Sequence, residues 1–196
     1  MKTSAWLVAV LLAAPLIACE PRTTPPTFNA TDITGASFAR DFQLTDHNGQ
    51  TRTLADFRGK LVAMFFGYTH CPDVCPTTMA DLAAAIKLLG PDGNKVQVLF
   101  VTVDPERDVA HLLKQYVPAF NPTFLGLHPT PEQLKMLATE YKVVYQKNPG
   151  REEGNYLMDH SAGTYVYDTQ GRLRLLMPYG TSAALMARDF KALLAH

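Results

Sequence analysis

The sequence has no excess of charge of either sign, and this absence excludes one class of partner. It contains 18 Lys and Arg residues against 18 Asp and Glu residues, so its formal net charge is zero. Proteins that bind nucleic acid usually carry a basic excess or a basic stripe. The balanced charge therefore argues against nucleic acid as a partner.

Cysteine is also scarce, with three residues in a chain of 196. Small secreted proteins that depend on disulfides use many more, so a disulfide scaffold is excluded. The hydrophobic fraction of 47% is enough to build an apolar core. The length suits one domain with a short appendage, and each cysteine needs its own explanation.

Long hydrophobic runs are missing as well, because no stretch approaches the roughly 20 apolar residues of a membrane-spanning helix. The apolar run from Ala5 to Ala14 follows a basic start at Lys2 and has the layout of a secretory signal. The next residues, Leu16-Ile17-Ala18-Cys19, resemble the lipobox of bacterial lipoproteins, although an ordinary signal peptide could also contain a cysteine. We expect a lipoprotein signal peptide at 1–18, lipid on Cys19, and a protein anchored to the extracytoplasmic face of a membrane, the periplasmic face in a Gram-negative cell.

Residues 19–35 are rich in Pro and Thr without an apolar period, which predicts a semi-extended linker. The segment 36–196 alternates strand-like and helix-like patterns. Strands are expected at 42–44, 51–54, 61–66, 96–103, 124–127, 164–167 and 172–177, and helices at 76–89, 108–117, 131–144 and 181–194. This order predicts an α/β domain with a central mixed sheet flanked by helices and a C-terminal β-hairpin and helix. A strand, a cysteine-bearing loop and a helix in succession suit a thioredoxin-like fold.

The chemistry centres on Cys71 and Cys75, four residues apart where a buried strand gives way to a helix. One helical turn would place both side chains on one face, close enough for a disulfide or for two sulfurs on one metal ion. Backbone N–H groups at a helix start favour thiolate. The spacing leaves a redox couple and half of a metal site both open. An inert structural disulfide is a weaker alternative, because closing so short a loop adds little stability.

Three segments of the sequence resemble the Sco (SenC) family of copper-binding proteins, which support assembly of cytochrome c oxidase. They occur in the family's order and are GYTHCPDVCP at 67–76, VDPERD at 103–108 and DHS at 159–161. The resemblance implies that Cys71, Cys75 and His160 bind copper. Two thiolates and an imidazole suit Cu(I) and can also hold Cu(II), whereas structural zinc prefers a fourth ligand that the sequence does not offer.

Two acidic residues beside these ligands are further candidates. Asp73 could influence the pKa values of the cysteines or donate weakly to Cu(II), and Asp159 could accept a hydrogen bond from the His160 ring. A turn residue and a surface residue, respectively, are equally good interpretations. His70 is adjacent to Cys71, but the family does not use it as a main ligand. We interpret the acidic run at 104–108 as a turn and helix start.

The resemblance implies a copper metallochaperone rather than an enzyme. Such a protein would deliver copper to the dinuclear centre in the copper-bearing subunit of cytochrome c oxidase, directly or with other periplasmic copper carriers. The alternative is a membrane-anchored thiol–disulfide oxidoreductase that uses Cys71 and Cys75 to keep the oxidase cysteines reduced. Three residues between the cysteines, rather than two, and no proline around His160 favour copper. A thiol peroxidase ranks below both, because the sequence ties no arginine to the site.

Overall fold

The computed structural model describes residues 27–150 and 156–195. The expected signal peptide at 1–18 and the expected lipidation site at Cys19 lie outside these residues. Within the two described ranges, no helix combines the length and the apolar character needed to cross a bilayer.

A mixed sheet of eight strands forms the middle of the protein, in the order β1-β10-β9-β4-β5-β6-β2-β3. Its strands are β1 (Thr31–Asp32), β2 (Gln43–Asp46), β3 (Thr51–Thr53), β4 (Leu61–Gly67), β5 (Val96–Thr102), β6 (Leu125–His128), β9 (Thr164–Tyr167) and β10 (Leu173–Met177). The central β4 pairs parallel with β5 and antiparallel with β9. The predicted hairpins form as β2–β3 and β9–β10.

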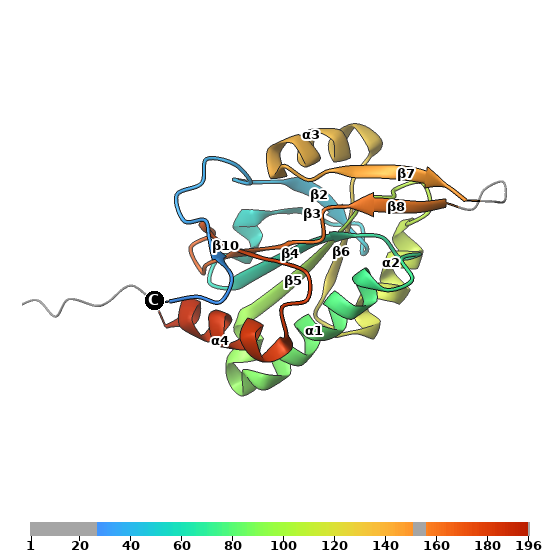
Figure 1. Ribbon diagram of the computed structural model, residues 1–196. Coiled ribbons are helices and arrows are strands. Elements are labelled where there is room, and N and C mark those ends of the chain that lie inside the picture. The colour runs from blue at the N-terminus through green and yellow to red at the C-terminus, as the bar shows by residue number, and fades with distance from the viewer. Residues whose placement is uncertain (1–26, 151–155, 196) are drawn as a thin grey trace, which may run out of the picture.

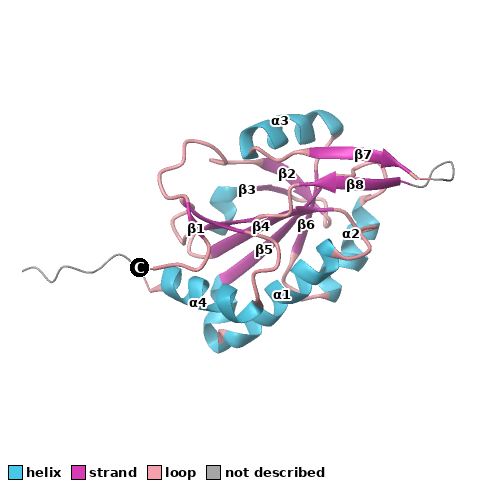
Figure 2. Ribbon diagram, in the orientation of Figure 1, coloured by secondary structure: helices cyan, strands magenta, loops and turns pink. Residues whose placement is uncertain are grey.

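Helices lie on both faces of this sheet (Figures 1 and 2). They are α1 (Val74–Leu88), α2 (Ala110–Tyr116), α3 (Pro131–Tyr141) and α4 (Ala183–Leu194). The expected extension of α3 to Val144 is wrong, because Lys142 adopts a left-handed conformation with φ of 54° and ends the helix. In α4, Phe190 and Leu193 are buried as expected, but Leu185 is 40% exposed and Met186 takes its place in the core.

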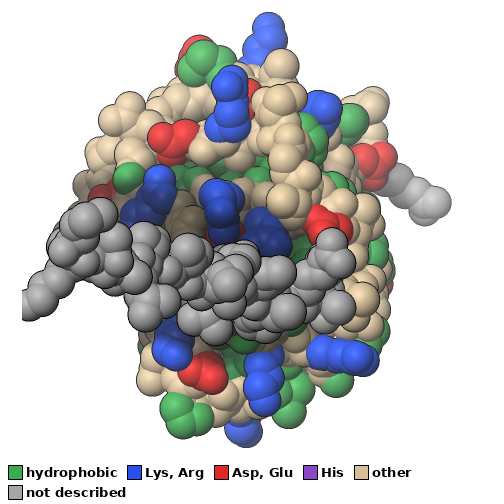
Figure 3. Space-filling model, turned by 90° about the vertical axis from the view of Figure 1, so that its left-hand side faces the viewer, with side chains coloured by type: hydrophobic (Ala, Val, Ile, Leu, Met, Phe, Trp, Pro, Cys, Tyr) green, Lys and Arg blue, Asp and Glu red, His purple; other side chains and the backbone are tan. Residues whose placement is uncertain are grey.

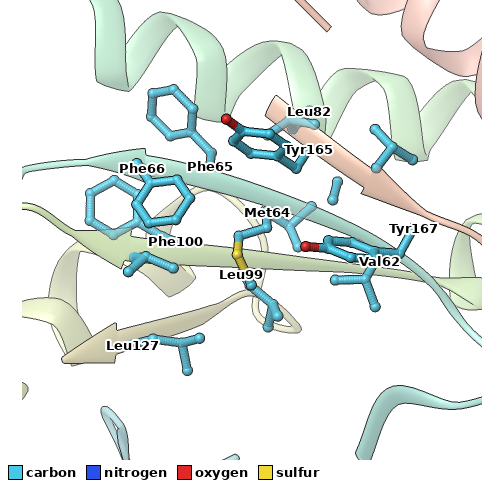
Figure 4. Close-up of a cluster of buried hydrophobic side chains, with 14 of the residues drawn as sticks. Val62, Met64, Phe65, Phe66, Leu82, Leu99, Phe100, Leu127, Tyr165 and Tyr167 are labelled. Atoms are coloured by element: carbon cyan, nitrogen blue, oxygen red, sulfur yellow. The ribbon is translucent and has the colours of Figure 1, made fainter. Parts of the chain in front are cut away.

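Every residue of β4 and β5 is buried, which explains their continuous apolar sequences. The side chains of β4 point alternately to the two sides of the strand (Figure 4). The Phe66 ring packs on Tyr141 of α3, with ring centroids 5.3 Å apart. Phe65 points to the opposite face, where its ring lies 6.2 Å from that of Phe100. This rigid centre supports the loop that follows β4.

Residues 29–34, which the sequence interpretation assigned to the linker, are part of the fold. Thr31 and Asp32 form β1, which pairs antiparallel with β10. The fully buried Asp189 of α4 accepts hydrogen bonds from the backbone N–H groups of Asn29 and Ala30, at 2.9 Å each. A two-residue strand of polar side chains has no apolar period to reveal it, so only its pairing shows that the fold includes these residues.

A second sheet of two antiparallel strands, β7 (Tyr145–Pro149) and β8 (Tyr156–His160), was not predicted. In Figure 1 this β7–β8 hairpin lies along the upper edge of the molecule. Of the residues in these two strands, only Tyr156 and Met158 are buried, so the strands show little apolar patterning. The hairpin bears on the predicted metal site because β8 ends at His160.

Candidate metal centre

The two cysteines are positioned by the connection from β4 to α1. Cys71 lies in the loop between Gly67 and Val74, and Cys75 is the second residue of α1. The backbone N–H of Cys75 donates to Cys71 Sγ at 3.5 Å, so the helix start orients the first sulfur. Cys71 is half-buried, Cys75 is fully buried, and both are free thiols in the structure.

Gly67, at the end of β4, leaves the space that the buried sulfur occupies. A Cβ placed on Gly67 would lie 3.0 Å from Cys75 Sγ and 2.8 Å from the ring of Phe65. Both contacts are shorter than side chains normally tolerate. In the sequence Gly67 stood out only as part of a motif, whereas the structure shows that a glycine is needed for Cys75 to approach the strand.

His160 brings the third donor to the same place. Sγ of Cys71, Sγ of Cys75 and a ring nitrogen of His160 all lie within 4.8 Å of one another. Nε2 is 3.4 Å from Cys75 Sγ, and Nδ1 is 3.1 Å from the carbonyl oxygen of Ser161. Because a carbonyl can only accept, Nδ1 carries the proton and the lone pair of the neutral ring lies on Nε2, facing the sulfur. The structure thus brings the three predicted ligands together.

Burial sets the protonation of this cluster. It lowers the pKa of His160, which keeps the imidazole neutral near pH 7 and its Nε2 lone pair available. It also raises the pKa of Cys75, so the metal-free protein holds this group as a thiol whose S–H can donate to Nε2. The expectation that the helix start favours thiolate is wrong for Cys75, because loss of water raises its pKa by more than the backbone hydrogen bond from Tyr68 lowers it. A bound metal ion would have to displace this proton.

Aromatic rings enclose the buried side of the cluster, while its other side is open. The His160 ring lies edge-on to Tyr68, with centroids 5.8 Å apart, and to Phe65 at 6.1 Å. A surface hollow of about 350 Å³ borders the site, and its walls include Tyr68, Cys71, Val74 and His160. An ion can therefore enter past Cys71 and meet the buried Cys75 behind it.

The buried carboxylate of Asp108 anchors the loop that precedes Cys71. It accepts hydrogen bonds from the backbone N–H of Thr69 at 2.9 Å, from Thr69 Oγ1 at 2.5 Å and from Thr102 Oγ1 at 2.7 Å. Asp108 has no exposed surface, so these bonds form away from water, where they are strong. The cysteine loop is thereby fixed to the end of β5.

Arg107 and Asp104 connect the loop after β5 to the strand that carries His160. Asp104 is buried and accepts from Arg107 Nε at 2.5 Å and from the hydroxyl of Tyr156 at 2.7 Å. Arg107 Nη1 donates to the carbonyl oxygen of Tyr156 at 3.0 Å, and its guanidinium lies 3.4 Å from the centre of the Tyr156 ring. Tyr156 is the first residue of β8 and His160 is the last.

The interpretation of 104–108 as a turn and helix start is thus incomplete. The run also holds the cysteine loop through Asp108 and the β7–β8 hairpin through Arg107. Sequence reasoning missed this role because Arg107 and Tyr156 lie 49 positions apart. The dense run of charges at 104–108 was the only indication of this role in the sequence, and it does not show which residues the charges contact.

The two outer candidates have different outcomes. Of the two interpretations of Asp159, the structure shows the surface residue: the His160 ring donates to Ser161, and the exposed Asp159 accepts from Asn148 Nδ2 at 2.5 Å. Strand alternation explains this, because neighbours in β8 point to opposite sides. Asp73 precedes α1, accepts a 3.4 Å hydrogen bond from Thr77 Oγ1 and lines the hollow beside the site. Its influence on the cysteines stays a prediction.

Comparison with known proteins identifies the family of this chain. Residues 30–195 match the family model described as SCO1/SenC. The sequence is 44% identical over 133 residues to a Mus musculus protein, the mitochondrial protein SCO2 homolog, an alignment that covers 67% of this chain and 52% of the mouse protein. The alignment spans about half the length of the vertebrate relatives and about 65% of the Rickettsia relatives.

Two solved structures match nearly over their whole length. Bradyrhizobium japonicum ScoI, determined with copper bound, is 39% identical with a TM-score of 0.72, covering 79% of this chain and 98% of that one. The apo Sco1 protein of Thermus thermophilus is 42% identical with a TM-score of 0.76, covering 86% and 98%. The predicted thioredoxin-like α/β fold, with a central mixed sheet between helices, is confirmed.

Proposed function

This chain belongs to the SCO1/SenC family, and on that basis we propose that it is a copper metallochaperone whose ligands are Cys71, Cys75 and His160. One observation carries the proposal, namely the convergence of two sulfurs and one imidazole nitrogen within 4.8 Å at the end of a rigid strand. These donors come from two segments that are distant in sequence, and backbone and aromatic contacts hold each of them in place.

The donor set suits copper better than other metals. Thiolate and imidazole together select Cu(I), which accepts low coordination numbers, and they can also hold Cu(II). Structural zinc prefers four ligands. Among the described residues, no fourth Cys, His, Asp or Glu joins the group of three. Copper is therefore the ion that this incomplete, half-enclosed set of ligands fits.

The difference in exposure between Cys71 and Cys75 supports a carrier rather than an enzyme. Cys75 is fully buried and Cys71 is half-exposed at the wall of the hollow, so an incoming ligand can reach the ion from the Cys71 side. Exchange of ligands on that side would pass copper to a recipient. The recipient that we propose is the dinuclear copper centre in the copper-bearing subunit of cytochrome c oxidase, reached directly or through other copper carriers.

We place the protein at the outer face of a membrane, anchored by lipid on Cys19. This placement rests on the short apolar run and the lipobox-like Leu16-Ile17-Ala18-Cys19. Metabolic labelling with a palmitate analogue tests it. The wild type should incorporate label and Cys19→Ser should not; equal labelling of the two would exclude Cys19 as the attachment site.

A thiol–disulfide oxidoreductase is the second candidate, and one observation favours it. Both thiols are free, and His160 Nε2 lies 3.4 Å from Cys75 Sγ, where it can accept the proton that leaves on oxidation. In such a reaction Cys71 and Cys75 would lose two electrons and two protons to form one disulfide, and a substrate disulfide would gain them as two thiols.

Copper loading separates the two candidates. The full chain, reduced and loaded with Cu(I) and separately with Cu(II), is analysed by native mass spectrometry beside Cys71→Ser, Cys75→Ser and His160→Ala. His111→Ala serves as a control because His111 is exposed and lies outside the site. We expect one copper per chain in the wild type and control, and weakened binding in the three site variants. If the wild type binds no more copper than the cysteine variants but cycles with a glutathione buffer, the reductase replaces the chaperone.

A further inference from the structure

A hollow of about 610 Å³ lies at the other end of the sheet from the metal centre. It forms where the segment after β1 passes the turn before β10, and its lining includes Thr34, Phe38, Arg40, Arg172 and Arg174. Register locates it beside the start of β4, because Leu173 pairs with Tyr167 and Tyr167 pairs with Val62. Cys71 and Cys75 follow the end of β4, a seven-residue strand about 20 Å long.

Guanidinium groups gather around this hollow. Arg40, Arg172 and Arg174 line it, and Arg58 lies against its rim at Gly171, where a Cβ would be 3.4 Å from Arg58 Cζ. Figure 3 shows Lys and Arg side chains around a depression on this face. Four cationic side chains from three separate segments thus face one hollow.

The local carboxylates neutralise only part of this charge. The buried Asp168 accepts from Arg172 Nε at 2.8 Å and from Arg174 Nη1 at 3.3 Å. Glu140 lies 3.7 Å from Arg40 Nε, with both side chains open to solvent. Within the described residues, Arg58 has no ion pair. At ion-pair distance the four guanidinium groups face two carboxylates, and the carboxylate of Asp32 also interacts with Arg174 from farther away, so a net positive charge remains.

The arginines are also held in position. Asp168 fixes Arg172 and Arg174 side by side, and Arg174 Nε donates to Thr34 Oγ1 at 2.9 Å. The Nη groups of Arg172 and Nη2 of Arg174 have no protein acceptor among the described residues, so they keep free N–H groups. The two Nη groups of Arg172 form a guanidinium fork that can donate two hydrogen bonds to the oxygens of a phosphate group, and Nη2 of Arg174 can donate a further one.

We propose that this hollow binds a phosphate group. Two sources offer this chemistry, the headgroup of an anionic lipid and free inorganic phosphate. A lipid headgroup bound here would turn the opposite end of the sheet, with Cys71 and Cys75, away from the bilayer. The proposal is independent of copper binding, because it uses no residue of the metal centre.

The test compares two triple variants of the full chain that remove equal charge. Arg40→Gln/Arg58→Gln/Arg172→Gln changes the hollow, and Lys87→Gln/Lys114→Gln/Lys135→Gln changes exposed lysines on α1, α2 and α3. Arg174 is kept in both, because it packs against the fold. Copper loading should be equal in the wild type and both variants, which confirms folding and separates this proposal from the proposed function.

One arm titrates inorganic phosphate and follows the amide resonances of residues 34–40 and 171–174. The other measures sedimentation with vesicles of phosphatidylcholine alone and with added phosphatidylglycerol; the neutral vesicles report binding by any other part of the chain. A basic residue near an anionic surface contributes about a factor of five to membrane affinity. Loss of three arginines should therefore lower the preference for anionic vesicles roughly 100-fold, and loss of the three lysines should lower it much less. Phosphate-induced shifts without this difference would identify free phosphate as the ligand. Equal behaviour of the two variants in both arms would overturn the proposal.

Discussion

Replacing Arg107 by Gln should weaken copper binding although Arg107 contacts no copper ligand. The change removes the ion pair with Asp104, the hydrogen bond to the Tyr156 carbonyl oxygen and the stacking on the Tyr156 ring. These contacts hold the start of β8, and the same strand ends at His160. We therefore expect His160 to sample more orientations and to lose part of its value as a ligand.

The structure allows the loss of stability and the loss of copper affinity to be estimated. Removing one partner of a buried ion pair costs about 3–5 kcal/mol. Arg107 retains 20% side-chain exposure and Asp104 keeps the hydrogen bond from Tyr156, so we expect a loss of about 2–3 kcal/mol in the free energy of unfolding. Groups that orient a metal ligand contribute about 10- to 100-fold to affinity. Because Arg107 acts through the strand, we expect about 10-fold weaker Cu(I) binding, or about 1.4 kcal/mol.

The assay is Cu(I) competition with a chromogenic chelator, together with urea unfolding of the metal-free, reduced protein. Arg52→Gln is the matched control, because Arg52 pairs with the fully buried Asp46 at 2.8 Å, remote in sequence from the ligands. It should cost similar stability and leave copper affinity unchanged. Arg107→Gln is also measured in the His160→Ala background, where its effect on copper should vanish. An equal loss of affinity in both backgrounds, or the same loss in Arg52→Gln, would refute positioning through His160.

Three further changes test other parts of the structure. In Gly67→Ala the new methyl group would clash with Cys75 Sγ, which should cost about 1–3 kcal/mol of stability. Copper binding should also weaken in the same competition assay. Unchanged copper affinity would show that the strand end can adapt. Burial lowers the pKa of His47 below its usual 6.5. The stability that comes from keeping His47 neutral is therefore complete above pH 6.5. It is lost as the pH falls toward the folded-state pKa, by up to about 1.4 kcal/mol per pH unit. His47→Asn, which can accept the same backbone hydrogen bond, should flatten this dependence in urea melts between pH 5.5 and 7.5, and equal slopes would contradict the burial argument. Asp189→Ala leaves the amides of residues 29–30 without their acceptor, so hydrogen exchange there should accelerate, whereas unchanged protection would mean that β1 pairing alone holds this segment.

Local patterns were sufficient where the buried positions of an element are apolar. The run 61–66 and the run 96–103 identified β4 and β5, since a strand that is covered on both faces must be apolar throughout. Elements held by polar contacts escaped prediction. β1 is held by pairing and by Asp189, and the β7–β8 hairpin by Arg107 and Asp104, and such contacts leave no periodic mark in the sequence.

The sequence by itself indicated the kind of chemistry, because residue type decides which atoms can bind a metal ion, and the resemblance to the Sco (SenC) family implied the three donors. It also determined the place of the cysteines, since four residues at a helix start bring two side chains to one face. Only the tertiary structure decided how His160 approaches them, which nitrogen it presents, and that burial keeps Cys75 protonated. These properties depend on distances and on loss of water between segments that are far apart in the chain, and no local pattern encodes either quantity.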